Sequence, residues 1–186
     1  MAVIRSACAV LLGLGLLAGD ALAAQADPVE TAVSFQLRTR WGQRVAGTFP
    51  EREATVERLA DGRHRVHVVL ATGSVEILAS PRYTQLARGP RFFDAERHPQ
   101  ITFVSTAFAP ELLERGGPLG GTLTLHGVSR EETFQVEPSA CARPGHDCDV
   151  IAHGTVQRDD YGLDGLQMML GNRVHFTLRV RHAKGS

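Results

Sequence analysis

The chain has 186 residues, in which 20 Lys and Arg balance 20 Asp and Glu, so its formal net charge is zero. A balanced chain without a basic stripe lacks the electrostatic footprint of a nucleic-acid-binding protein, and we expect no nucleic-acid partner. The length is sufficient for one domain with a sizeable apolar core.

The first 23 residues have the pattern of a secretory signal peptide. Arg5 supplies a positive charge and Ala7–Ala18 an apolar run, and Ala21-Leu22-Ala23 is a small-residue cleavage site, with Ala24-Gln25-Ala26 as a second choice. The run is shorter than the roughly 20 apolar residues of a membrane-spanning helix. We therefore expect cleavage near Ala23, a mature domain of residues 24–186 in the periplasm or outside the cell, and no stable membrane insertion. An uncleaved N-terminal anchor is the alternative.

The mature chain is a succession of segments in which apolar and polar residues alternate. The apolar faces consist of Val33, Phe35 and Leu37; Val66, Val68 and Leu70; Val150, Ala152, Gly154 and Val156; and Val174, Phe176, Leu178 and Val180. This period of two indicates antiparallel strands with one buried face. We predict eight or nine strands, a short helix over Pro81–Arg88 and a helical turn over Leu166–Leu170. Periodicity alone leaves a barrel and a sandwich open.

Two further blocks, Phe92–Phe108 and Gly120–Phe134, each join a turn to an alternating strand. In the first, Pro99 prevents a helix, and a strand follows with Ile101 and Phe103 on one face and Thr102 on the other. In the second, a strand with Leu123 and Leu125 on one face turns at His126-Gly127 and returns. The second block therefore predicts a β-hairpin.

The mature chain has two cysteines, Cys141 and Cys148, on either side of Pro144-Gly145. An even number of cysteines in an exported protein predicts a disulfide. A zinc site that uses His146 or His153 is the alternative.

Four sequence motifs together resemble the YceI-like, polyisoprenoid-binding family. They are FFD-x-x-x-x-P-x-ITF-x-S (Phe92–Ser105), G-x-LTLHGV-x-R (Gly121–Arg130), Gly154–Leu163 and Leu170–Val180. The resemblance implies an all-β, antiparallel eight-stranded lipocalin-like barrel with one or two short helices and a long apolar pore. It also implies an isoprenoid ligand of the polyprenyl or quinone type.

The residue pattern contains no catalytic constellation, phosphate-binding loop or metal motif, and we expect no catalytic residue, metal or cofactor. Asp159 and Asp160 are adjacent, so a regular strand would point them to opposite faces. Arg158 and Asp159 are predicted to form an ion pair at the surface or the rim. His126 is interpreted as a turn residue, with a catalytic or ligand-contacting role as the alternative.

We predict that the barrel cavity is lined by large apolar side chains. The predicted lining residues are Phe35, Trp41, Leu70, Phe92, Phe103, Leu125, Met168, Met169 and Phe176. The predicted function is a non-catalytic carrier for an isoprenoid or other long-chain apolar lipid. A lipid hydrolase or isomerase and a ligand-free structural, stress-related barrel are the alternatives, and a homodimer is left open.

Overall fold

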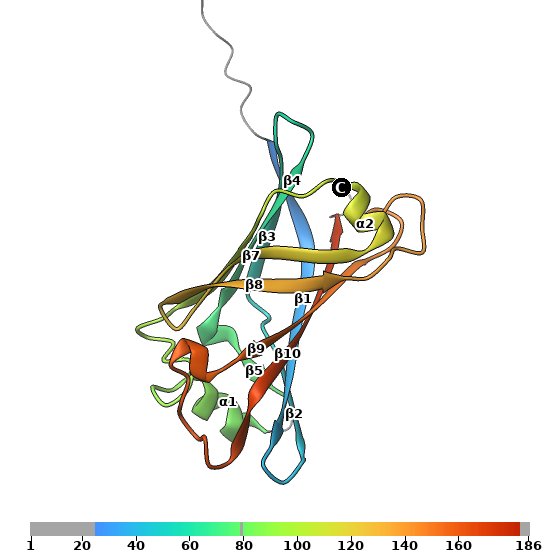
Figure 1. The fold of residues 1–186 in the computed structure, drawn as a ribbon. Helices are drawn as coiled ribbons and strands as arrows, with labels where there is room; N and C mark the ends of the chain where they lie inside the picture. Colours follow the sequence, from blue (N-terminus) through green and yellow to red (C-terminus); the bar gives the residue numbers. More distant parts are fainter. Residues whose placement is uncertain (1–24, 79, 183–186) are drawn as a thin grey trace, which may run out of the picture.

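The computed structural model describes residues 25–78 and 80–182. Within these residues the chain forms one antiparallel sheet that curls into an elongated barrel, with short helical segments at the two ends (Figure 1). The strands are β1 (Gln25–Thr39), β2 (Arg44–Thr48), β3 (Arg52–Arg58), β4 (His64–Ala71), β5 (Glu76–Ile77), β6 (Gln100–Ser105), β7 (Gly117–Leu125), β8 (Val128–Val136), β9 (Val150–Gln157) and β10 (Leu170–His182). The helical segments are η1 (Thr72–Ser74), α1 (Pro81–Arg88), α2 (Glu111–Arg115) and η2 (Asp159–Tyr161).

The sheet closes because β1 and β10 pair along most of their length, with Val33 opposite Leu178 and Phe35 opposite Phe176. The closed order is β1-β3-β4-β6-β7-β8-β9-β10, and β2 and β5 extend the sheet from the second half of β1. The predicted all-β, eight-stranded lipocalin-like barrel is therefore confirmed, and a sandwich is excluded. The predicted helix over Pro81–Arg88 is confirmed as α1.

The alternation of the sequence becomes the inside and outside of the barrel. In β6, Ile101 and Phe103 are buried, whereas Thr102 on the opposite face is partly exposed. The inward-facing hydroxyl of Ser105 accepts a hydrogen bond of 2.9 Å from the backbone N–H of Val66 in β4. The polar hydroxyl at this inward position is thereby satisfied, as a buried polar group must be.

The seam between β8 and β9 is the weakest part of the barrel wall. These strands pair in register only at Gln135–His153 and Val136–Ala152. Where the strands diverge, Tyr161 of η2 is fully buried and its hydroxyl donates to the Glu132 carboxylate at 2.8 Å. Burial and this hydrogen bond raise the pKa of the Tyr161 hydroxyl far above its usual value. Side chains therefore replace backbone hydrogen bonds in closing this part of the wall.

Predictions for three other segments, the cysteine loop, the turn before β10 and the N-terminus, compare differently with the structure. Cys141 and Cys148 form the predicted disulfide. The segment before β10 is a single hydrogen-bonded turn, in which the N–H groups of Met169 and Leu170 both donate to the Leu166 carbonyl at 2.8 Å. Leu166 has a positive φ of 63°, outside the right-handed helical region, so the segment predicted as a helical turn over Leu166–Leu170 is one hydrogen-bonded turn that is not helical. The predicted signal peptide lies outside the described residues.

None of the helices in the described part of the chain has the length and apolarity to cross a membrane.

Candidate ligand cavity

The half of the barrel nearest α2 encloses a cavity of about 110 Å³. Its walls come from the inward faces of β1, β4, β6, β7, β8, β9 and β10, together with Phe108 between β6 and α2, one residue of α2 and two of the disulfide loop. Every lining residue is apolar: Val33, Val66, Val68, Leu70, Ile101, Phe103, Phe108, Leu113, Leu119, Leu123, Leu125, Phe134, Val136, Pro144, Gly145, Val150, Ala152, Phe176, Leu178 and Val180. Such a surface favours apolar ligands in proportion to the area that they bury.

The mouth of this cavity is covered by α2 and by the loop that carries the disulfide. Leu113 of α2 and Pro144 and Gly145 of the loop all line the cavity. Ser139 connects the two covers, because its hydroxyl donates to the Leu113 carbonyl at 2.6 Å and its N–H to the Glu114 carbonyl at 3.2 Å. The disulfide therefore constrains a loop that forms part of the cavity mouth.

The half of the barrel nearest α1 is filled by aromatic side chains. Phe35 lies 5.4 Å from Phe49 and 6.0 Å from Phe176, and Phe92 lies 4.8 Å from Phe93, all measured between ring centroids. Tilted and edge-on rings at these separations pack favourably. They leave a void of only about 10 Å³, which shares Leu125 and Phe176 with the larger cavity. These two side chains therefore separate the hollow half of the barrel from the filled half.

Arg158 lines the small void of the filled half and is only 2% exposed. Its guanidinium lies 4.9 Å from the centroid of the Phe92 ring and donates hydrogen bonds to the carbonyls of Gly165 and Gly171. Burial lowers the pKa of this guanidinium, whereas the nearby Asp159 and Asp164 raise it. The predicted surface ion pair with Asp159 is therefore wrong: Arg158 is a buried group that binds backbone carbonyls and an aromatic face.

Six of the nine predicted lining residues lie along the barrel interior. Leu70, Phe103, Leu125 and Phe176 line the larger cavity, and Phe35 and Phe92 line the small void together with Leu125 and Phe176.

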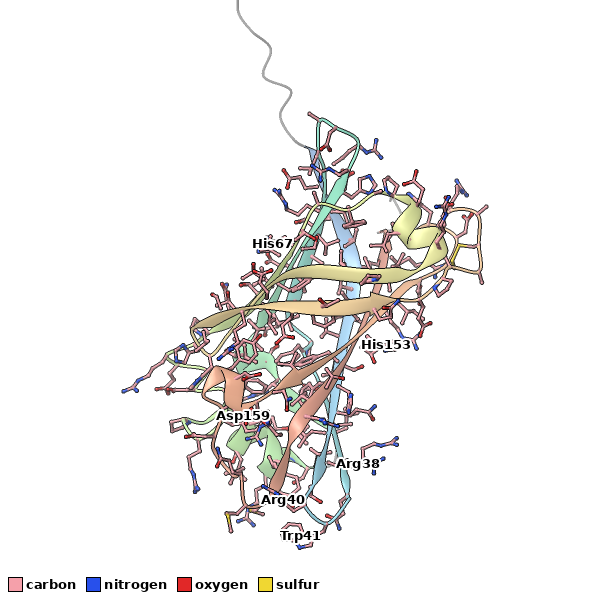
Figure 2. All side chains as sticks on the ribbon, in the orientation of Figure 1. Arg38, Arg40, Trp41, His67, His153 and Asp159 are labelled. Atoms are coloured by element: carbon pink, nitrogen blue, oxygen red, sulfur yellow. A yellow bond between two sulfur atoms is a disulfide. The ribbon has the colours of Figure 1, made fainter. Side chains whose placement is uncertain are left out.

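The other three predicted lining residues, Trp41, Met168 and Met169, lie outside the barrel. Their exposed fractions are 70%, 87% and 48%, and Figure 2 shows Trp41 at the tip of the β1–β2 hairpin, pointing away from the strands. Met169 lies in the turn before β10, where its carbonyl accepts a hydrogen bond of 2.9 Å from the Arg40 N–H. Turn residues beyond the last rung of a sheet are not directed inward by strand alternation, and this is why the prediction failed for these three.

The sequence prediction also missed residues that the structure brings to the cavity. Leu113, Pro144 and Gly145 lie in segments without strand periodicity. The disulfide was a usable signal, because it constrains the loop that carries Pro144 and Gly145.

His126 occupies the β7–β8 turn, as predicted. Its Nδ1 lies 3.2 Å from the backbone carbonyl of Tyr161, so the ring does bond to backbone, but to a segment far along the chain rather than within its own turn.

The chain is similar in sequence and in fold to several known proteins. UPF0312 protein SAS2572 of Staphylococcus aureus (strain MSSA476) is 26% identical over 162 residues, covering 81% of this chain and 91% of that protein. Among solved structures, BcnA of Burkholderia cenocepacia superposes with a TM-score of 0.64 at 20% identity, covering 81% of this chain and 94% of BcnA. A domain from Saccharophagus degradans, described as polyisoprenoid-binding, gives a TM-score of 0.61 at 12% identity, covering 87% of this chain and all of that domain. At these identities the two structures show a shared fold. The sequence profile of the YceI-like domain matches residues 25–182, and the chain therefore belongs to the YceI-like family.

Proposed function

We propose that this protein is a non-catalytic carrier that holds an isoprenoid or other long-chain apolar lipid in its barrel. The observation that carries the proposal is the entirely apolar lining of the cavity near α2. The similarity to a domain described as polyisoprenoid-binding supports the isoprenoid class of ligand. General acid–base catalysis needs a titratable side chain within hydrogen-bond reach of the substrate, and this lining offers hydrocarbon instead.

The cavity volume sets a condition on this function. About 110 Å³ is of the order of the ~150 Å³ engineered apolar cavity that binds one benzene molecule, and a polyprenyl chain is much larger. A long ligand therefore requires the barrel to widen or its two voids to join. The β8–β9 seam is the part of the wall that we expect to move, because its two strands are in register at only two residue pairs.

The proposal includes export to the periplasm or the cell exterior, with removal of residues 1–23. A disulfide between Cys141 and Cys148 supports an oxidising compartment. N-terminal sequencing of the exported protein tests this part: we expect a new terminus near Ala23, and recovery of Met1 would contradict it.

The direct test of the carrier function is mass spectrometry of organic extracts from the purified protein, followed by the pair of variants Phe103→Asp and Thr102→Asp. Phe103 lines the cavity, whereas Thr102 points outward from the same strand. We expect the wild type to yield an apolar lipid. Phe103→Asp should lose most of it, because a carboxylate is costly to desolvate in an apolar wall, and Thr102→Asp should retain it.

Circular dichroism must show that both variants are folded before their lipid contents are compared. A folded wild-type protein that carries no extractable lipid and binds neither a quinone nor a polyprenol would contradict the carrier proposal. Equal loss of lipid in the two folded variants would contradict the assignment of the cavity as the binding site.

A further inference from the structure

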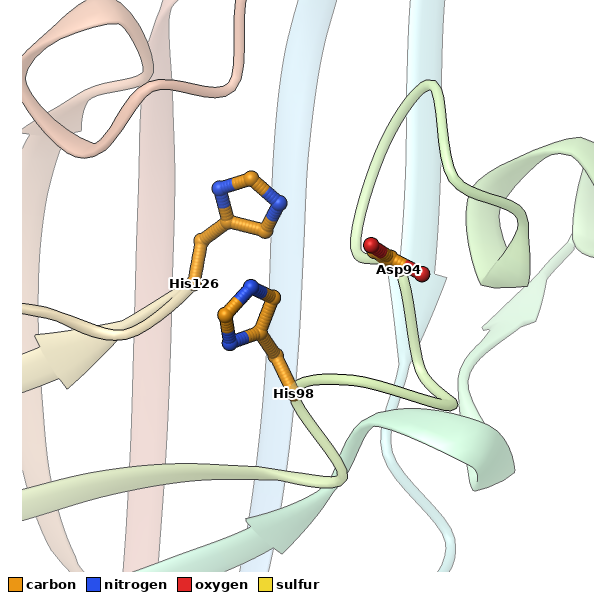
Figure 3. Close-up of side chains that lie close together, drawn as sticks. All are labelled: Asp94, His98 and His126. Atoms are coloured by element: carbon orange, nitrogen blue, oxygen red, sulfur yellow. The ribbon is translucent and has the colours of Figure 1, made fainter.

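Three side chains with metal-binding atoms meet outside the apolar cavity, near the filled end of the barrel. They are Asp94, His98 and His126, and the potential ligand atom of each lies within 4.8 Å of the other two. All three are partly buried. Figure 3 shows the two imidazole rings next to each other and the Asp94 carboxylate across from them.

The backbone holds Asp94 and His98 on the same side of a tight turn. The N–H groups of Arg97 and His98 both donate to the Asp94 carbonyl, at 3.0 and 2.8 Å, and Asp94 adopts a positive φ of 45°. This hydrogen-bonded turn returns the chain at His98 to Asp94, and the potential ligand atoms of the two side chains lie within 4.8 Å of each other. The carboxylate and the first imidazole are therefore brought together by local structure.

The second imidazole arrives from the β7–β8 hairpin. His126 and Gly127 have φ values of 53° and 76°, as a two-residue type I′ turn requires. The His98 and His126 rings approach to 4.4 Å between centroids. A Cβ atom at position 127 would lie only 3.0 Å from Cε1 of His98, so glycine permits this approach as well as the turn.

A hydrogen bond fixes the orientation of the His126 ring. Its Nδ1 lies 3.2 Å from the Tyr161 carbonyl oxygen, and because a carbonyl only accepts, Nδ1 must carry the proton. In the neutral ring the lone pair is then on Nε2, and Figure 3 shows that nitrogen on the side facing Asp94. Histidines that bind metals usually donate their other ring N–H to a carbonyl or carboxylate in this way.

We propose that Asp94, His98 and His126 form a binding site for a divalent transition metal of the zinc class. Two imidazoles and one carboxylate are the donor set of many three-ligand zinc sites, in which water or another group takes the fourth position. Ligand atoms around a tetrahedral zinc are about 3.3 Å apart, so the separations of up to 4.8 Å must close by at most ~1.5 Å. Side-chain rotation supplies movements of that size.

The ion pair of Asp94 with Arg97, which would compete with a metal ion, is weak. The Arg97 guanidinium lies 3.9 Å from the Asp94 carboxylate, and its side chain is 83% exposed. Such a pair contributes little and is readily exchanged for a metal ion. Since Asp94 follows Phe93 and His126 follows Leu125, a bound metal would link two segments that close the filled end of the barrel.

The test uses the protein without a histidine tag, treated with EDTA and titrated with Zn²⁺ by calorimetry and by thermal unfolding. We expect binding of one Zn²⁺ and an increase in Tm, since a ligand that binds only the folded state stabilises it. Ca²⁺ and Mg²⁺ should give no such increase, because they prefer all-oxygen sites. His98→Gln, His126→Gln and Asp94→Asn should each weaken Zn²⁺ binding by at least ~10- to 100-fold, the loss that outer-shell changes already cause.

His153→Gln is the matched control. His153 also pairs with a carboxylate, that of Glu137 at 2.5 Å, but on the exposed outer surface. This variant should bind Zn²⁺ like the wild type. If it loses binding while the three variants keep it, or if the wild type shows neither binding nor a Tm increase, the proposal is overturned.

A measurement on the wild type alone covers the case in which a variant fails to fold. Zinc-edge X-ray absorption of the stoichiometric complex reports how many imidazoles bind the ion. Two imidazoles with additional oxygen ligands support the site, and fewer than two overturn it.

Discussion

The two halves of the barrel share the same strands but differ in what fills them. At successive inward positions of β1, Val33 lines the cavity near α2, whereas Phe35 belongs to the aromatic cluster near α1. In β10, Leu178 lines the hollow half and Phe176 stands at the boundary. The cavity volumes, about 110 and 10 Å³, follow from this difference in side-chain size. One step between neighbouring inward positions, which is two residues along the strand, thus decides whether the barrel is a container or a packed core.

Among the variants in the filled half, Arg158→Ala should cause the largest loss in the free energy of unfolding. The substitution leaves the carbonyls of Gly165 and Gly171 without their guanidinium donor and opens a void beside Phe92. Unsatisfied buried carbonyls cost about 1–3 kcal/mol each, so we expect a loss of roughly 3–5 kcal/mol in the free energy of unfolding. Urea denaturation measures it.

Arg130→Ala is the comparison for this prediction. Arg130 also bonds to a backbone carbonyl, that of Asp160 at 2.7 Å, but its side chain is 51% exposed. We expect a loss of about 1 kcal/mol or less, because water replaces an exposed partner. Equal losses in the two variants would show that burial of Arg158 does not determine its effect.

Phe176→Ala should remove the boundary between the two halves. Phe176 lines both voids and packs against Phe35 at 6.0 Å. Because the side chain is only partly buried, we expect a loss of about 2–4 kcal/mol, somewhat below that of a fully buried phenylalanine. We also expect the retained lipids, measured by mass spectrometry, to shift towards longer chains.

Leu178→Ala tests whether the shift in lipid chain length comes from joining the two voids or only from a larger cavity volume. Leu178 lines only the hollow half, so this variant widens the cavity without joining the two voids. It should change the amount of lipid retained but not its chain length. An equal shift in chain length for both variants would contradict the role of Phe176 as the boundary.

Cys141→Ser removes the disulfide at the mouth of the hollow half, the end of the barrel opposite to the aromatic cluster. The disulfide closes a loop with a sequence separation of 7, for which chain entropy predicts a stabilisation of about 2–3 kcal/mol. The fold and lipid binding should persist, but release of a fluorescent apolar ligand should be faster, because Pro144 and Gly145 then move more freely at the mouth. Unchanged release would show that the loop does not control access.

The sequence predicted the walls of the barrel better than its ends. Alternation placed Ile101 and Phe103 inside and Thr102 outside correctly, because each strand residue is directed by its own backbone. Trp41 and Met168 were placed inside from their side-chain type and not from alternation, and this failed because their turns lie beyond the sheet and their direction depends on tertiary contacts.

The polar residues near the filled end were the least predictable. The carbonyls that bind Arg158 belong to a turn and a strand start 7 and 13 residues further on, so an adjacent Asp159 was the only local partner to propose. Likewise, the approach of His126 to Asp94 and His98 depends on the folding of a hairpin against a distant turn. The sequence supplied the residue types, and long-range packing supplied the geometry.

The smallest effect that we predict concerns His64, beside the hollow half. Its ring packs at 6.0 Å against Phe108, a lining residue, and its Nδ1 is buried without a hydrogen-bond partner in the described part of the chain. Burial, and to a lesser extent Arg58, lowers the pKa of the His64 imidazole in the folded state. As the pH falls through the unfolded-state value of about 6.5, the unfolded chain therefore takes up a proton first, and the free energy of unfolding decreases. His64→Phe keeps a ring against Phe108 but cannot titrate, so its urea midpoint should fall less than that of the wild type between pH 7.5 and pH 5. The other histidines titrate in both proteins, and the difference between the two profiles isolates His64. Parallel profiles would show that protonation of His64 is not coupled to folding.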